Sequence, residues 1–233
     1  MSTKKEQSIH DYESSFTRMA NLVLHQLGLI EKVMLSTDAG DQGRLIDEIN
    51  ANEKEIDRLE VVISDKFINA IVLYQPLASD LRKLVAIYRM SINVERIGDL
   101  VMNMAYAIES ICKSEEYIFM SDVILNMFQS GRLMVEKSLL SFVNADQDFA
   151  VWTIKNDSVV DEMNNKLLSN TIARSAMDRK TKNMLLSYID IKNIISNIER
   201  IADHATNIAE ATIYSLRGTD IRHSGFEKSD TQE

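Results

Sequence analysis

Apolar residues recur at helical spacing through almost the whole chain of 233 residues. In one stretch they are separated by three, four or seven positions, so they line one face of a helix. These residues are Ile49, Ile56, Leu59, Ile63, Phe67, Ala70 and Tyr74. The same pattern predicts six helices, at about 8–35, 44–75, 76–113, 122–144, 149–174 and 182–217.

Few residues interrupt this pattern. The chain has one proline and seven glycines, which are too few turn-forming residues for a β architecture with many turns. The predicted breaks are the Gly-rich segment Ser36–Gly43, the single Pro76 and the polar segment Ser114–Asp122. Gly218 suits the position just after the last helix. An all-α fold follows.

A motif occurs twice, 104 residues apart. NVERIGDLVMNMA (93–105) and NIERIADHATNIA (197–209) are identical at seven of thirteen positions. The preceding helix repeats at the same offset, because Asn52 and Asp57 align with Asn156 and Asp161. Two structural copies explain this best, each a bundle of three long antiparallel helices. We therefore predict one bundle at 1–115, a second at 116–218, and a polar, frayed tail at 219–233.

Acidic side chains are repeated with the motif. Glu95 and Asp99 lie four residues apart, Asn103 continues their row, and Glu53 and Asp57 lie at the edge of the apolar face of the preceding helix. The second copy offers Asp157, Asp161, Glu199, Asp203 and Asn207. Each pair of acids at i,i+4 repels by about 0.2–0.5 kcal/mol. Four carboxylates on one patch of each bundle therefore require protonation or a bound cation.

These ten residues are candidate metal ligands. Carboxylate and amide oxygens without thiolates suit hard cations such as Mg, Ca, Mn or iron, and pairs from two helices can bridge more than one ion. A solvated pair is the ordinary alternative for any single ladder, with Arg96 or Arg200 supplying the local ion pair. His204 is expected either to lie on the surface or to support the metal ligands from behind, rather than to be a metal ligand itself.

Charge and composition exclude several function classes. The formal net charge of −9 argues against a nucleic-acid phosphate backbone or an anionic lipid surface as the main partner. The single Cys112 cannot form an intrachain disulfide. The N-terminus has no apolar signal-peptide region, and no run of about 18 apolar residues could cross a membrane. We find no catalytic machinery, and no Glu-x-x-His of the kind that ferritin-like oxidases use.

Two segments resemble the PhoU family of phosphate-signalling regulators. They are QPLASDLRKLVAIYRMSINVERIGDL (75–100) and NIERIADHATNIAEATIYSLRG (197–218). The resemblance implies two three-helix bundles and a cytoplasmic negative regulator of the phosphate-starvation response. It implies that the protein bridges a phosphate ABC transporter and a sensor histidine kinase, and that it forms a homodimer. It also implies iron, zinc, manganese or magnesium ions, some in multinuclear clusters, on the four Glu/Asp-x3-Asp motifs.

Two other classes of function stay open at this point. A spectrin-like helical repeat would act as a scaffold without metal or a link to phosphate. A metal-dependent oxidase or hydrolase lacks the expected His ligands and general base. The copies also differ, because Asp80 and Arg82 have no counterpart in the second copy, and Gly98 becomes Ala202.

Overall fold

The computed structural model describes residues 4–175 and 182–222, with side chains left undescribed at 164–175 and 182–185. The described residues form six helices and no strand, which confirms the all-α prediction. The helices are α1 (Lys4–Leu35), α2 (Ala39–Tyr74), α3 (Ala78–Ile111), α4 (Glu115–Val143), α5 (Gln147–Ser175) and α6 (Lys182–Arg217).

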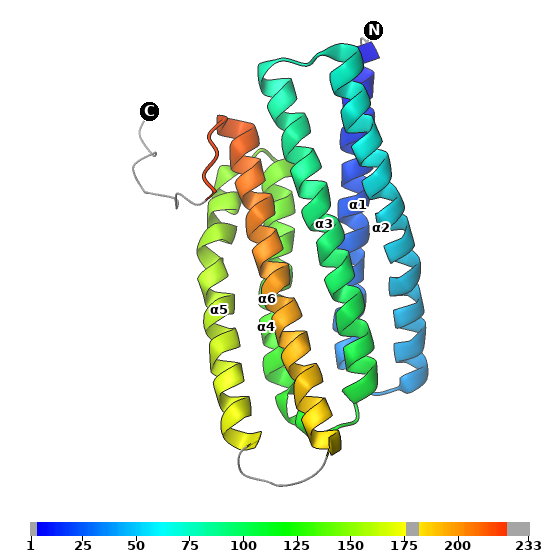
Figure 1. Ribbon diagram of the computed structural model, residues 1–233, viewed down its shortest axis with the longest axis vertical. Coiled ribbons are helices and arrows are strands. Elements are labelled where there is room, and N and C mark those ends of the chain that lie inside the picture. Colours follow the sequence, from blue (N-terminus) through cyan, green and yellow to red (C-terminus); the bar gives the residue numbers. More distant parts are fainter. Residues whose placement is uncertain (1–3, 176–181, 223–233) are drawn as a thin grey trace.

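The helices pack as two bundles of three that stand side by side. Helices α1–α3 form one bundle and α4–α6 the other, and α3 lies antiparallel to α6 between them (Figure 1). The buried apolar residues form a core that continues from one bundle into the other, with Ile97 and Ile201 almost fully buried. The predicted tandem bundles are therefore confirmed, and they share a core. No described helix combines the length and the apolar character needed to cross a bilayer.

Two helices begin earlier than the sequence pattern predicts. Helix α2 starts at Ala39 because the Asp38 side chain accepts a hydrogen bond from the Asp41 N–H (2.8 Å), so both glycines of the predicted break lie inside the helix. Helix α4 starts after Ser114, whose hydroxyl accepts from the Tyr117 N–H (3.2 Å). The predicted starts near 44 and 122 are wrong, because side-chain capping and burial of Tyr117 outweigh the polar composition.

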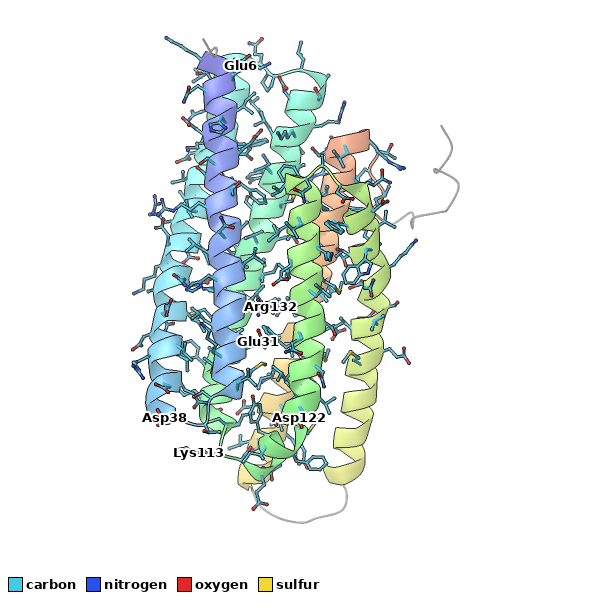
Figure 2. The ribbon with its side chains drawn as sticks, turned by 180° about the vertical axis from the view of Figure 1, so that it is seen from behind. Glu6, Glu31, Asp38, Lys113, Asp122 and Arg132 are labelled. Atoms are coloured by element: carbon cyan, nitrogen blue, oxygen red, sulfur yellow. The ribbon has the colours of Figure 1, made fainter. Side chains whose placement is uncertain are left out.

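Polar contacts also join the bundles away from the shared core. Arg132 of α4 forms an ion pair with Glu31 of α1, and Gln129 donates to the same carboxylate (2.8 Å; Figure 2). Between α3 and α6, His204 Nδ1 lies 2.9 Å from Asn93 Oδ1. His204 is thus half-buried in the interface between the bundles rather than on the open surface, and its predicted alternative role behind the metal ligands stays a prediction.

The chain after α6 turns back toward α3. Gly218 has a φ of +77°, as expected of a glycine that ends a helix, and its Cα faces the Arg82 side chain. Asp220 then pairs with Arg89 of α3. Residues 219–222 of the predicted tail thus contact α3, while 223–233 lie outside the described residues, as do residues 176–181 between α5 and α6.

Candidate metal centres

The first carboxylate cluster lies between α2 and α3. Glu53 of α2 is 6% exposed, and it interacts electrostatically with Asp57, Glu95 and Asp99. Asp57 is exposed, and Glu95 and Asp99 are half-buried. The structure thus brings together four of the predicted residues. It places Glu53 deeper than predicted, because α1 covers it.

A buried amide from α1 holds the Glu53 carboxylate. Gln26 is fully buried, and its Nε2 donates to Glu53 Oε2 (2.8 Å) and to the Ile49 carbonyl (3.2 Å). Gln26 Oε1 and Glu53 Oε1 are both buried without a hydrogen-bond partner. Two acceptor oxygens thus lack a donor or a cation, which is costly in a buried position.

Burial and like charge raise the pKa values of this cluster. The pKa of Glu53 is raised to about 7, mainly by burial and also by the neighbouring acids Asp57, Asp99 and Glu95, while the hydrogen bond from Gln26 opposes this rise. The pKa of Glu95 is also raised, first by burial and then by Asp99 and Glu60, although the Arg96 guanidinium lowers it. Arg96 pairs with Glu95 (3.5 Å) rather than with Asp99 as predicted. The patch is therefore poised to bind protons or cations near neutral pH.

The second cluster repeats this arrangement between α5 and α6. The pKa of Asp157 is raised to about 6, mainly by burial and also by Asp203, Asp161 and Glu199, while the Thr206 hydroxyl opposes this rise. The pKa values of Glu199 and Asp203 are also raised, and burial is the largest cause for both. Asp157 Oδ1 is buried without a hydrogen-bond partner. The structure thus brings together the four predicted acids of the second copy.

The space around Glu53 differs from the space around its counterpart Asp157. A methyl group on Gly98 would lie 2.7 Å from Glu53 Oε2, closer than real contacts allow. In the second copy the shorter Asp157 replaces Glu53, and Ala202 replaces Gly98. A long acid facing glycine is thus exchanged for a short acid facing alanine.

The two asparagines of the ladders lie beside a different feature. Asn103 and Asn207 are exposed, and each lines a hollow between α3 and α6. Of the predicted metal ligands, these two asparagines have the least connection to Glu53 and Asp157.

The carboxylate oxygens of the two clusters suit a hard cation, although their side chains are not arranged around a common point. Over the described residues, no three His, Cys, Asp or Glu side chains are grouped so that they could hold a metal ion. The unpaired oxygens of Glu53 and Asp157 fit cation ligands in their chemistry. Coordination by three or more carboxylates would require rotamer changes upon binding. The metal sites stay a prediction.

Three residues of the site and its surroundings have contacts that the sequence does not reveal. Gln26 occupies an apolar position of α1 and has no motif. Asp80 accepts from Lys5 Nζ (2.6 Å) and so ties α3 to α1, which gives it a structural role in the first bundle alone. Asn93, which the motif repeats as Asn197, bridges to His204 and also donates to the Arg89 carbonyl (2.8 Å).

Fold and site together define a class of protein, namely an all-helical tandem repeat with one acidic patch per bundle. Comparison with known proteins then identifies the family. The PhoU domain matches residues 16–108 and 124–212, which is one match in each bundle. The chain belongs to the PhoU family, and the predicted resemblance is confirmed.

Relatives match most of the chain. A "Phosphate-specific transport system accessory protein PhoU homolog" from Pseudomonas aeruginosa is 28% identical over 94% of this chain and 87% of its own length. A Burkholderia homologue with the same description is 31% identical over 85% of this chain and 86% of its own. A crystal structure of PhoU from Pseudomonas aeruginosa superposes with a TM-score of 0.83 at 27% identity, covering 91% of this chain and 99% of that one.

The exchange between the copies yields a stability prediction. We expect Gly98→Ala to lower the free energy of unfolding by about 1–3 kcal/mol, because the new methyl group displaces the Glu53 carboxylate. Adding Glu53→Asp should recover much of this loss, since it reproduces the pair found in the second copy. Urea unfolding of both single variants and the double variant measures the coupling. Gly131→Ala is the control, because its methyl group would meet Ile198 at an ordinary 3.6 Å. Additive single effects would contradict the prediction.

The raised pKa of Glu53 yields a pH prediction. Its ordinary value is 4.5 and its folded value is about 7, so the folded state binds more protons than the unfolded state between these pH values. The free energy of unfolding should therefore fall as the pH rises through this window. Glu53→Gln should reduce this fall and be more stable than the wild type at pH 8. Its amide can also donate to the unpaired Gln26 Oε1.

Urea unfolding at pH 5 and pH 8, in the presence of a chelator, tests this expectation. Asp47→Asn removes an exposed carboxylate from the same helix and serves as the control. Parallel pH profiles for wild type and Glu53→Gln would show that Glu53 does not titrate near neutral pH.

Proposed function

We propose that this protein is a non-catalytic accessory protein of phosphate uptake and a negative regulator of the phosphate-starvation response. In this role it bridges a phosphate ABC transporter and a sensor histidine kinase on the cytoplasmic side of the membrane, as a homodimer. Membership of the PhoU family supports the proposal, as do relatives described as accessory proteins of a phosphate-specific transport system.

The observation that carries the proposal is the duplicated acidic patch. Each bundle places one acid, the buried Glu53 or the half-buried Asp157, beside three further carboxylates. A structural repeat without a ligand would have no need to bury like charges twice. Bound cations would offset the repulsion and link α2 to α3 and α5 to α6, which fixes the outer faces of both bundles for docking.

The ligand chemistry supports iron, manganese, magnesium or zinc. The cluster residues provide carboxylate oxygens, and the absence of thiolates among them disfavours soft ions. The neighbouring acids can share more than one ion, so multinuclear clusters are part of the proposal. Asn103 and Asn207 would complete the ligand set if the ladders bind along their full length.

A metal-free scaffold is the second candidate. It is favoured by the finding that, among the described residues, no three carboxylate, histidine or cysteine side chains are grouped so that they could hold a metal ion. In that case the patches would be acidic docking surfaces, and buried protons would replace the cations.

Elemental analysis separates the two candidates. We expect tag-free protein purified without chelator to hold at least about one metal ion per bundle. The variant Glu95→Gln, Asp99→Asn, Glu199→Gln, Asp203→Asn should hold little, because half of each carboxylate set is gone. Inductively coupled plasma mass spectrometry measures both.

The matched control also removes four negative charges, but from exposed sites outside the clusters. It is Asp47→Asn, Asp65→Asn, Glu109→Gln, Asp122→Asn. Equal metal content in the two quadruple variants would favour the metal-free scaffold.

A cellular assay tests the regulatory role. In a bacterium lacking its own PhoU-domain protein, we expect this chain to restore repression of a phosphate-starvation promoter in high phosphate. The cluster variant should repress less, because the docking face is no longer fixed, while the control variant should repress like the wild type. Full repression by the cluster variant would separate regulation from the acidic patches.

A further inference from the structure

Two hollows lie in the groove between α3 and α6, and the internal repeat relates them to each other. One has a volume of about 230 Å³ and is lined by eight residues. Six of these correspond, at the offset of 104, to residues that line the other hollow, of about 540 Å³. Asn93 corresponds to Asn197 and Asn207 to Asn103, but Arg89 of the smaller hollow corresponds to Asn193.

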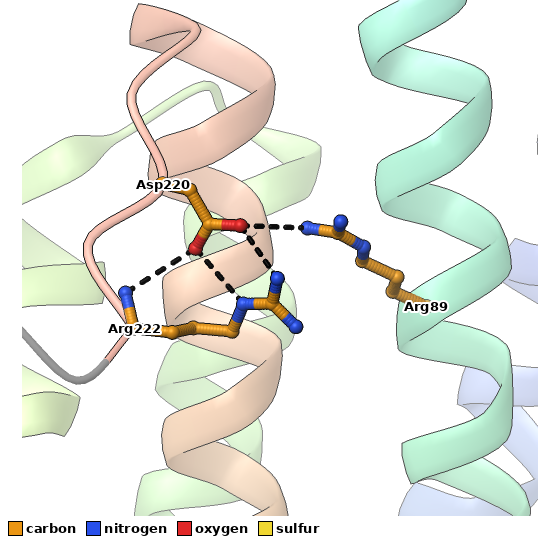
Figure 3. A network of polar contacts seen from close by, with 3 residues as sticks. All are labelled: Arg89, Asp220 and Arg222. Atoms are coloured by element: carbon orange, nitrogen blue, oxygen red, sulfur yellow. Dashed lines mark hydrogen bonds and ion pairs between the residues drawn. The ribbon is translucent and has the colours of Figure 1, made fainter.

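The smaller hollow holds a carboxylate between two guanidinium groups. Asp220 comes from the segment after α6, and Arg222 donates to both of its oxygens, at 2.6 and 2.8 Å (Figure 3). Arg89 reaches the same carboxylate from α3 at a longer 3.4 Å. These contacts hold the pKa of Asp220 well below its usual range.

The arginines around this carboxylate are held in place by other contacts. The Arg89 guanidinium lies 4.9 Å from the centre of the Tyr214 ring. Arg82 packs against Gly218, and its Nε is buried without a hydrogen-bond partner. Among the residues that line the hollow, Arg89 and Arg222 lie with the carboxylates of Asp220 and Glu210, and Glu210 acts on Arg222. Release of Asp220 would leave two guanidinium groups and one carboxylate in the lining, an excess of positive charge in a protein whose net charge is −9.

Asp220 fills this site incompletely. Both of its oxygens are engaged by Arg222, so Arg89 stays beyond the 2.7–2.9 Å typical of a charge-assisted hydrogen bond. A tetrahedral oxyanion has further oxygens for Arg89 and for the Asn207 amide that lines the same hollow. Arginine pairs recognise phosphate groups through this fork-shaped geometry.

We propose that this hollow binds a phosphoryl oxyanion, either inorganic phosphate or a phosphate group on a partner, and that the Asp220 carboxylate occupies its place in the free protein. Ligand and Asp220 compete for Arg89 and Arg222, so binding displaces the Asp220 side chain. This loosens the tie between α3 and the segment after α6. The larger hollow is not such a site, since it has Asn193 in place of Arg89 and a single arginine, Arg200, in its lining. Its Asp190 carboxylate accepts from the Ser110 hydroxyl (3.1 Å). The proposal uses none of the acidic side chains of the patches, and Asn207 is the one residue that it shares with the proposed metal ligands.

Titration with inorganic phosphate tests the competition. Isothermal titration calorimetry on chelator-treated protein, in low-salt buffer free of sulfate, avoids binding through cluster metals. We expect Asp220→Asn to bind phosphate at least about tenfold more tightly than the wild type, because a competing charge-assisted contact is removed. Adding Arg89→Gln should abolish the gain.

The matched control is Asp190→Asn, which removes a carboxylate from the equivalent hollow and should bind like the wild type. A gain of the same size in Asp190→Asn would overturn the proposal, because it would reflect net charge alone. Absence of binding in Asp220→Asn would also overturn it and leave the arginine–aspartate contacts as a structural clasp. Circular dichroism melts confirm that each variant is folded.

Phosphoserine in place of phosphate separates the two sources of the oxyanion. Binding as tight as that of phosphate supports a phosphate group on a partner, and selectivity for phosphate supports the free ion.

Discussion

The antiparallel packing of α3 against α6 is the constraint on which the rest of the structure depends. Contacts along this interface pair residues from opposite ends of the two helices, from Met90 with Thr212 to Ser110 with Asp190. This crossing fuses two bundles that would otherwise each present an apolar face, and so creates one core. The same two helices carry both ERIxD motifs, so their packing also fixes where the acidic patches lie.

The acidic patches work against stability, and the structure shows how the cost is limited. Glu53 is buried in the first patch and Asp157 is half-buried in the second, while Asp57 and Asp161 lie in solvent, where repulsion is weak. Gln26 offers Glu53 one donor but leaves two oxygens unpaired. A fold selected for stability alone would favour apolar side chains at these positions. The charge retained in both copies is the basis of the proposed cation binding.

Sequence reasoning succeeded where the pattern is local or repeated, and it failed where tertiary contacts decide. Helical spacing and the offset of 104 residues predict six helices, two bundles and two sets of four acids. The start of α2 was missed because Gly40 and Gly43 suggest a break, whereas Gln42 is buried and its Nε2 donates to the Val33 carbonyl (3.2 Å) across the turn. Gln26 could not be found, since an isolated amide at an apolar position has no signal. The contact of Asp220 with Arg89 joins residues 131 positions apart and follows from no local pattern.

Differences between the two copies separate what the fold requires from what it permits. The exchange of Glu53 with Gly98 for Asp157 with Ala202 preserves a buried acid within a fixed volume, so both copies keep the same chemistry. The exchange of Arg89 for Asn193 has no such compensation, because it leaves the larger hollow without the arginine that reaches the carboxylate in the smaller one. Symmetric features of this molecule thus point to a duplicated property, which is the acidic patch. The asymmetric feature, a pair of arginines closed by the chain's own carboxylate, points to a task carried out only once per chain.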